Sequence, residues 1–249
     1  MLKLELHSHT NHIQKNETNY SPKELIDKVS ELGYDVLCIT EHYFVHGNWP
    51  RYQQYPFKTY EDFKDYAKKK GILLMRGVEL RFNEGEVVLI NYHGDLSEIK
   101  KISDLKKIPK ETLVMAPHPF FLRKNCLGKD LEKNISLFDA IEWSHFYTKS
   151  WNMNIKAKEI AEKYGKPMVG TSDVHMLFQL NHSCTWINAR KDPRKIVEAI
   201  KQGKAKLVTK PMPIHLFIRL FASAVFFTAY FHALNRISKL TGTNFYREP

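Results

Sequence analysis

Histidines and acids recur at the ends of short apolar segments along this sequence. Seven such segments end, in order, in His7-Ser8-His9, Glu41-His42, Glu79, His93, His118-Pro119, Ser144-His145 and Ser172-Asp173-Val174-His175. Imidazole and carboxylate groups together suit zinc, manganese or iron ions. Side chains two residues apart in a strand point the same way, so His7 and His9 can chelate one ion. Asp173 and His175 can do the same or divide between neighbouring ions, and the pattern therefore predicts a multinuclear metal site.

Hydrolysis is the chemistry that such a site favours. A carboxylate such as Glu79 can bridge two ions with its two oxygens. Bound metal ions lower the pKa of a coordinated water to about 7 and neutralise the charge of a phosphoryl group. The joint pattern carries this prediction, because a single histidine at a strand end more often packs or caps. Metal contact by His93 and His145 is left open. The remaining histidines considered are interpreted as structural or surface residues: His46, His182, His215 and His232.

Helical segments alternate with the apolar runs and would position them. Ser21-Pro22-Lys23-Glu24 is a capping box with proline at the first helical position, and Gly33 is a natural end for this helix. Further helices are predicted to begin near Thr59, Ser150 and Asp192. Strands alternating with helices indicate an α/β fold built on parallel strands, whose carboxyl ends carry the working residues. Seven candidate strands run into Leu6, Thr40, Val78, Ile90, Met115, Ile141 and Val169.

The composition fits one sizeable domain with an anionic partner. The chain has 249 residues, 43% of them hydrophobic, and a formal net charge of +11. This surplus favours phosphate esters, nucleic acid or acidic lipid. Nucleic acid is not the favoured partner, because no helix or arm carries a dense basic stripe. Cys38, Cys126 and Cys184 form no CxxC pair, and no apolar signal core precedes His7, so a reducing, cytoplasmic location is expected.

The C-terminal segment differs from the rest of the chain. Residues 216–234 read LFIRLFASAVFFTAYFHAL, which is long enough to span a bilayer core, although Arg219 and His232 lie near its ends. We therefore divide the chain into a hydrolase barrel over residues 1–210 and an apolar helical extension over 211–249. Two interpretations of the extension stay open: a helix that packs on the barrel or on a second subunit, and membrane contact through residues 214–236.

Taken together, these motifs resemble the PHP family (polymerase and histidinol phosphatase). The matching residues follow in the family's order and cover about residues 1–210: His7-Ser8-His9-Thr10, Thr40-Glu41-His42, Gly77-Val78-Glu79, His118-Pro119 and Gly170-Thr171-Ser172-Asp173-Val174-His175. The resemblance implies a distorted seven-stranded β/α barrel, to which we add the C-terminal apolar helix from its composition alone, since the tail has no counterpart in the family pattern. It also implies metal-dependent phosphoester hydrolysis with two or three divalent ions, which we expect to be zinc, manganese or iron.

The resemblance also implies a division of the ligands among the ions. His7, His9, Glu79 and Asp173 match ligands of a first ion. Glu79 would bridge to a second ion, held by His118 and His93, and a third would be held by His42 and His175. His145 would contact substrate or metal. The chain departs from the family pattern at two positions. No aspartate lies near Gln14, where His12 or Glu17 could substitute. Glu41 stands where aspartate is usual, and we interpret it as a residue that orients a ligand.

The sequence thus predicts a metal-dependent phosphoric ester hydrolase that attacks a small phosphorylated substrate with a metal-bound hydroxide. We assign catalytic roles to Asp173, Glu79 and His145, and substrate-binding roles to Arg123, Lys124 and Arg81, which follow candidate strands. Two alternatives remain: a metal-dependent hydrolase of a non-phosphate bond, and a weakly catalytic module that binds membrane or nucleic acid.

Overall fold

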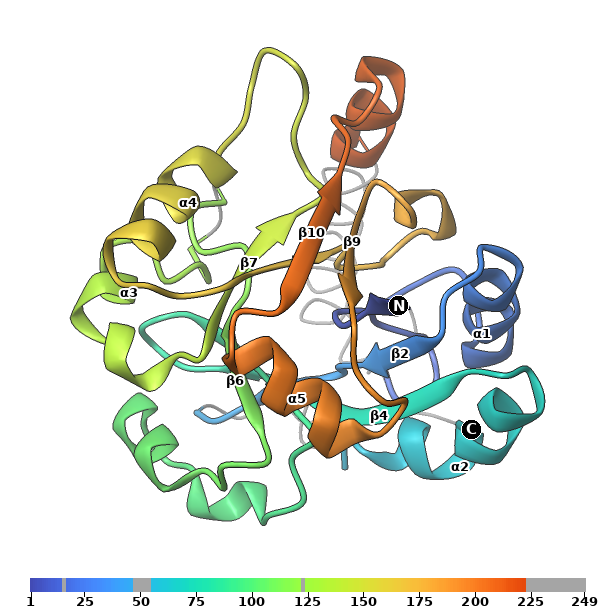
Figure 1. Cartoon of the computed structure of the whole chain (residues 1–249), viewed down its shortest axis with the longest axis horizontal. Helices are drawn as coiled ribbons and strands as arrows, with labels where there is room; N and C mark the ends of the chain where they lie inside the picture. The colour runs from blue at the N-terminus through green and yellow to red at the C-terminus, as the bar shows by residue number, and fades with distance from the viewer. Residues whose placement is uncertain (15–16, 47–54, 122–123, 223–249) are drawn as a thin grey trace, which may run out of the picture.

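The computed structural model describes residues 1–14, 17–46, 55–121 and 124–222 (Figure 1). The strands are β1 Leu2–Glu5, β2 Val36–Ile39, β3 His42–Phe44, β4 Leu73–Arg81, β5 Glu86–Ile90, β6 Leu113–Ala116, β7 Ala140–Ser144, β8 Met168–Thr171, β9 Ser183–Ile187 and β10 Ala205–Thr209. The α-helices are α1 Pro22–Glu31, α2 Lys58–Lys69, α3 Asp130–Lys133, α4 Asn154–Lys163 and α5 Pro193–Lys201. Short 3-10 helices lie at Leu96–Glu98, Ile102–Lys107, Ile135–Leu137 and Leu177–Gln179.

The strands form one mixed sheet that nearly closes into a barrel. Its order is β10-β9-β1-β2-β4-β5-β6-β7-β8, and β3 pairs with β4 outside this path. A parallel bridge between Ser8 and Val174 joins the segments that follow β1 and β8. Gly170 in β8 also exchanges two hydrogen bonds, of 2.9 and 3.0 Å, with the hydroxyl of Thr185 in β9. The predicted fold class, a distorted β/α barrel, is confirmed.

Strand direction departs from the prediction at one place. All seven candidate strands are present, as β1, β2, β4, β5, β6, β7 and β8, but β5 runs antiparallel to both of its neighbours. The reason is the connection between β4 and β5, only four residues long, in which Gly85 has a φ of +144°. A parallel crossover needs a dozen or more residues, so this connection makes a hairpin.

Local sequence signals account for the helix that precedes β2. The Ser21 side chain accepts a hydrogen bond from the Glu24 backbone N–H, and the Glu24 side chain accepts from the Ser21 backbone N–H. Leu25, Ile26 and Val29 of α1 are buried, and Gly33, with a φ of +70°, ends the helix. The capping box predicted from sequence thus orients α1 so that its apolar face covers the sheet.

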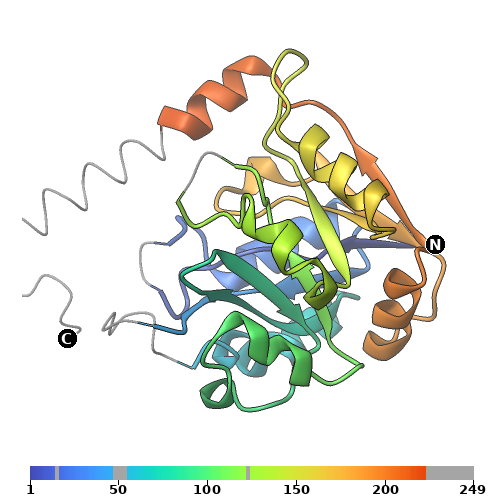
Figure 2. The same ribbon diagram turned by 90° about the vertical axis from the view of Figure 1, so that its left-hand side faces the viewer.

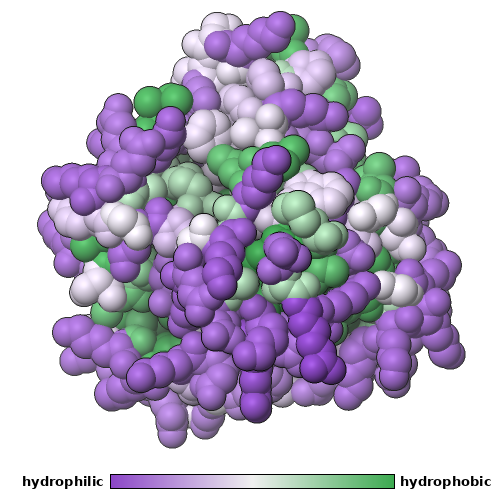
Figure 3. Space-filling model, viewed as in Figure 1, coloured by the Kyte–Doolittle hydropathy of each residue, from purple (hydrophilic) through white to green (hydrophobic). Residues whose placement is uncertain are grey.

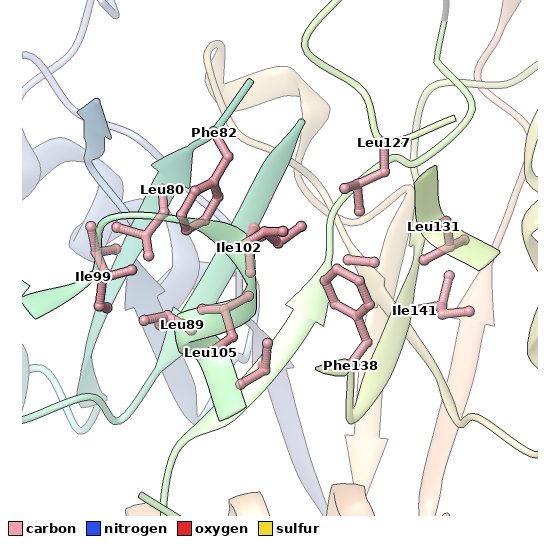
Figure 4. Close-up of a cluster of buried hydrophobic side chains, with 14 of the residues drawn as sticks. Leu80, Phe82, Leu89, Ile99, Ile102, Leu105, Leu127, Leu131, Phe138 and Ile141 are labelled. Carbon is pink, nitrogen blue, oxygen red and sulfur yellow. The ribbon is translucent and has the colours of Figure 1, made fainter. Parts of the chain in front are cut away.

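Hydrophobic clusters fix the strands that carry the site. The largest links β4 to β7 with the helical segments that cover them, and Figure 4 shows Phe138 and Ile141 on one side of it and Leu80, Leu89 and Leu105 on the other. A second cluster packs α5 against β1, β2 and their neighbours. Hydrophilic residues cover most of the face drawn in Figure 3. The rim residues therefore stand on a close-packed scaffold, which keeps their positions well defined.

The described part of the C-terminal extension is a helix over residues 214–222. Its Phe217 ring stacks on Phe146, with centroids 4.4 Å apart, and three apolar side chains on it are exposed: Ile214, Ile218 and Phe221. Figure 2 shows this helix at the edge of the barrel away from the N-terminus. Among the helices of residues 1–14, 17–46, 55–121 and 124–222, none has the length and apolar character needed to cross a membrane. The rest of the predicted membrane-contact segment, residues 223–236, lies outside the described residues.

Candidate metal centre

Seven of the predicted ligands meet at one rim of the barrel. They come from five different places in the sheet, and three of these places follow strands that run parallel to one another. His7 and His9 follow β1, His42 opens β3, Glu79 lies in β4, His118 follows β6, and Asp173 and His175 follow β8. Most of these side chains are buried, and Asp173 and His175 are 20% and 25% exposed. The rim is therefore a shielded polar cluster that opens to solvent on one side.

Four of these side chains surround one point. The Nε2 atoms of His7 and His9 lie 3.2 Å apart. His7 Nε2 is 3.4 Å from Glu79 Oε1 and 3.5 Å from Asp173 Oδ1. His9 Nε2 is 3.5 Å from Glu79 Oε2 and 3.2 Å from Asp173 Oδ1. This is the group that the sequence predicts for the first ion.

The separations between these atoms fit a bound cation. Zinc holds nitrogen and oxygen ligands at about 2.0–2.1 Å, and four ligands in a tetrahedron are then about 3.3 Å apart. A further atom points to the same conclusion, since Glu79 Oε1 is buried without a hydrogen-bond partner among the described residues. Buried polar atoms normally have partners. The donor set therefore fits a divalent metal ion.

A second group forms around His118, with one correction to the prediction. His118 Nε2 is 3.5 Å from Glu79 Oε1 and 3.8 Å from both Glu86 Oε2 and Asp173 Oδ2. The expectation that His93 joins this group is wrong. Because β5 is antiparallel, its first residue, Glu86, reaches the rim, whereas His93 is exposed beyond the far end of the strand and contacts Asn91 at 3.1 Å.

A third group joins His42, His175 and Glu17. Glu17 Oε1 is 3.2 Å from His175 Nε2 and 3.4 Å from His42 Nε2, and His42 Nδ1 is 2.7 Å from Glu79 Oε2. Of the two substitutes considered for the missing aspartate, the structure brings Glu17 to the site. His12 instead contacts Asp62 at 2.8 Å on the surface. Glu79 thus touches all three groups.

The cluster alternates strongly shifted acids and bases. Burial alone would lower the pKa of His7, but Asp173, Glu79 and Glu142 hold it well above its ordinary value. Burial opposes ionisation of Glu79, yet the charges of His42 and His7 hold its pKa well below its ordinary value. The ionised acids therefore need positive charge beside them, which protonated histidines or metal ions can supply.

His145 lies under the rim in a neutral form. Its side chain is buried, its Nε2 lies 2.9 Å from Gln179 Nε2, and burial lowers its pKa to about 4. A neutral ring accepts the Gln179 amide hydrogen. His145 is therefore not a proton donor near neutral pH, and the catalytic role assigned to it stays a prediction.

The basic residues assigned to substrate have different environments. Arg81 lies at the rim but pairs through Nε with Glu86 Oε1 at 2.8 Å, and its guanidinium lies 4.7 Å from the Phe44 ring centroid. Lys124 is exposed. Arg123 lies outside the described residues. The structure therefore leaves the substrate-binding assignments as predictions.

Two acids of the site escaped the sequence reasoning. Glu86 follows Gly85, and a glycine-centred hairpin was the signal that could have placed it. Glu142 stands inside the apolar strand β7 and is fully buried. A lone acid within an apolar strand was the signal there, since charged residues are almost never fully buried unless they are paired. The Glu41 side chain, interpreted as an orienting group, is buried and accepts a 3.0 Å hydrogen bond from Thr59.

A nearly closed β/α barrel with convergent histidines and acids at one rim defines a class of protein, the barrels whose rim side chains can hold metal ions. The family model of the PHP domain matches residues 5–176, well over half of the chain, and the chain belongs to this family. A model of the PHP-associated region matches residues 151–205. These matches confirm the resemblance drawn from the motifs. No curated protein matches the chain.

Solved structures of low sequence identity share the fold. A two-domain protein from Bacteroides vulgatus, described as containing a predicted PHP-like metal-dependent phosphoesterase, aligns with a TM-score of 0.63 and 19% identity, over 84% of this chain. The chain spans 64% of that protein's length. PsfC from Pseudomonas syringae aligns with a TM-score of 0.57 and 14% identity, over 92% of this chain and 98% of its own. A putative metal-dependent phosphoesterase from Bifidobacterium adolescentis aligns with a TM-score of 0.50 and 12% identity, over 70% of this chain and 87% of its own.

Proposed function

We propose that this protein is a metal-dependent phosphoesterase that hydrolyses a small phosphate ester with two or three divalent ions at the rim. The observation that carries the proposal is the first group, in which donors of His7, His9, Glu79 and Asp173 lie 3.2–3.5 Å apart. At such a centre, bound ions activate water near neutral pH and neutralise phosphoryl charge.

The residues of the chain divide this work among themselves. Glu79, within 3.5 Å of His118 on one side and of His7 and His9 on the other, would bridge two ions. Asp173 would also serve both, since its Oδ1 faces His9 and its Oδ2 faces His118. Glu17, with His42 and His175, would hold a third. Zinc, manganese and iron all suit this mixture of imidazole and carboxylate.

Charge and cysteine usage support a phosphorylated substrate and a cytoplasmic location. The net charge of +11 favours an anionic substrate, and exposed Lys124 stands near the rim segment that follows β6. Cys38, Cys126 and Cys184 are all free, as expected in a reducing compartment. A phosphoesterase function is also what the printed descriptions of two structural neighbours name for those proteins.

The test is hydrolysis of an aryl phosphate by protein reconstituted with manganese, zinc or iron. We expect turnover in the wild type, near-complete loss in Asp173→Ala and wild-type turnover in the matched control His93→Ala, whose imidazole lies away from the rim. Wild-type turnover in Asp173→Ala would exclude the proposed site. Metal-loaded wild type that hydrolyses a panel of amides or lactones, and no phosphate ester, would favour the non-phosphate alternative.

A further inference from the structure

A buried glutamate beneath the rim connects two of the ligand groups. Glu142 lies in the middle of β7 with no exposed surface. Its Oε1 lies 3.1 Å from His7 Nδ1 and also accepts a hydrogen bond from the Thr171 hydroxyl. Its Oε2 accepts a hydrogen bond from the His118 backbone N–H. One carboxylate thus holds residues that follow or belong to β1, β6 and β8.

The contact with His7 decides which ring nitrogen faces the rim. A neutral imidazole has one N–H and one lone pair. When Nδ1 donates its hydrogen to Glu142, the lone pair is on Nε2, which points at Glu79 and Asp173 from 3.4 and 3.5 Å. A carboxylate behind a ligating histidine fixes the tautomer and ring orientation and raises the basicity of the ligand.

The contact with His118 acts on the backbone instead. His118 has a φ of +24°, in the left-handed region that residues with a side chain rarely adopt. Such a conformation persists only where the surroundings hold it. The Glu142 carboxylate accepts the N–H of this strained residue and so fixes the turn that aims His118 Nε2 at Glu79, 3.5 Å away.

We propose that Glu142 is a positioning residue that couples the first and second ligand groups. It orients a ligand of each group, His7 through the ring and His118 through the backbone, without reaching the ions itself. Loss of this one carboxylate should therefore weaken both groups together. The proposal depends on the proposed function only in requiring that the rim binds metal.

The test compares metal affinity in Glu142→Gln and Asp104→Asn. Glutamine keeps the shape of the side chain but has one oxygen acceptor in place of two and no charge, so it cannot serve His7 and His118 together. Asp104 is a matched control, because it is also buried and its carboxylate accepts from the backbone N–H groups of Lys100 and Lys101, in the connection between β5 and β6 away from the rim. Cobalt affinity is measured by competition with a chelator, and the visible spectrum of the cobalt-loaded protein reports ligand geometry.

We expect Glu142→Gln to bind cobalt about 10–100-fold more weakly, the usual cost of removing an outer partner of a ligand, with an altered visible spectrum. Asp104→Asn should stay close to wild type. Glu142→Asp keeps the charge but withdraws the carboxylate by one methylene. This variant covers the case in which Glu142→Gln fails to fold, and we expect it also to bind cobalt tenfold or more weakly.

Three results would overturn the inference. One is wild-type affinity and spectrum in a folded Glu142→Gln or Glu142→Asp protein. Another is an equal loss in Asp104→Asn. The last is failure of both Glu142 variants to fold, which would make Glu142 a residue of the barrel core. Wild-type protein that binds no metal would instead exclude the proposed function, so the two failures are distinguishable.

Discussion

Glu79 is the residue whose replacement should affect metal binding most. Its carboxylate is 1% exposed and lies within 3.5 Å of His7, His9 and His118 and 2.7 Å from His42. Glu79→Gln keeps the volume of the side chain and removes the anion. Because Glu79 takes part in every ligand group, we expect this change to abolish stabilisation of the fold by metal.

The size of the effect follows from linkage between binding and folding. An ion that binds only the folded protein, at a free concentration 100 times its Kd, stabilises it by about 2.7 kcal/mol. For a domain of this size, each kcal/mol raises the Tm by about 2–4 °C. One ion should therefore raise the wild-type Tm by about 5–11 °C, and a second ion bridged by Glu79 should raise it by a similar amount again.

The assay is thermal unfolding after chelator treatment, with and without added zinc or manganese. The wild type should show the full shift, and Glu79→Gln should show almost none relative to its own metal-free baseline. Elemental analysis of the same samples gives the number of bound ions. A shift in Glu79→Gln equal to that of the wild type, with the same metal content, would refute the role of Glu79 as the shared ligand.

Three further predictions concern the second ligand group, the core and the C-terminal helix. His118→Ala should lose one bound ion and His93→Ala none, as measured by elemental analysis; equal loss in both would restore His93 as a ligand. Phe138→Ala removes a side chain that is 1% exposed in the cluster of Figure 4 and should lower the free energy of unfolding by about 3–5 kcal/mol in urea titrations; a change below 1 kcal/mol would mean that the cluster repacks. If the C-terminal helix contacts membrane, wild-type protein should sediment with vesicles containing phosphatidylglycerol. Ile218→Glu should weaken this sedimentation more than the control Ile155→Glu on α4. The two replaced side chains are 59% and 48% exposed, respectively. Wild-type protein that stays in the supernatant would exclude this contact.

Much of the fold could be predicted because its signals are local. The capping box at Ser21 and Glu24 forms as expected, and the strand preceding it and the strand following it both end at the rim. The HxH and SDxH segments were informative for the same reason, since strand geometry alone places His7 beside His9. Side chains that act at strand ends in this way can be found without knowledge of which strands are neighbours.

Strand direction could not be predicted in the same manner. An apolar run such as residues 87–90 has the same pattern whichever way it runs, so the histidine after it was assigned to the rim and the glutamate before it was overlooked. Only the short connection with Gly85 indicates that the strand direction reverses. Glu17 was left as one of two candidates because its approach to His42 and His175 depends on a loop, and loops carry no periodic signal.

Glu142 illustrates a different limit. Its partners are the ring of His7, 135 positions away, and the backbone of His118, and neither is visible from its own neighbourhood in the sequence. Within an apolar strand, an acid can face solvent at an edge or be enclosed among partners. The choice is made by the closure of the sheet, which is a property of the whole chain.

The bridge between Ser8 and Val174 has a consequence for how the protein is made. It joins the segments that follow β1 and β8, which lie far apart in the sequence, and the hydrogen bond from Ser172 N to Glu5 likewise links residues 167 positions apart. Glu79 and Glu86 meet in a hairpin long before β8 is synthesised, but His7 and His9 have no partner from the segment after β8 until Asp173 leaves the ribosome. Pairing over such a distance forms late, because the entropy of closing a long loop must be overcome first. Under the proposed function, metal would therefore join a nearly finished barrel, and a ribosome-bound nascent chain that stops short of β8 should hold no complete first group of ligands.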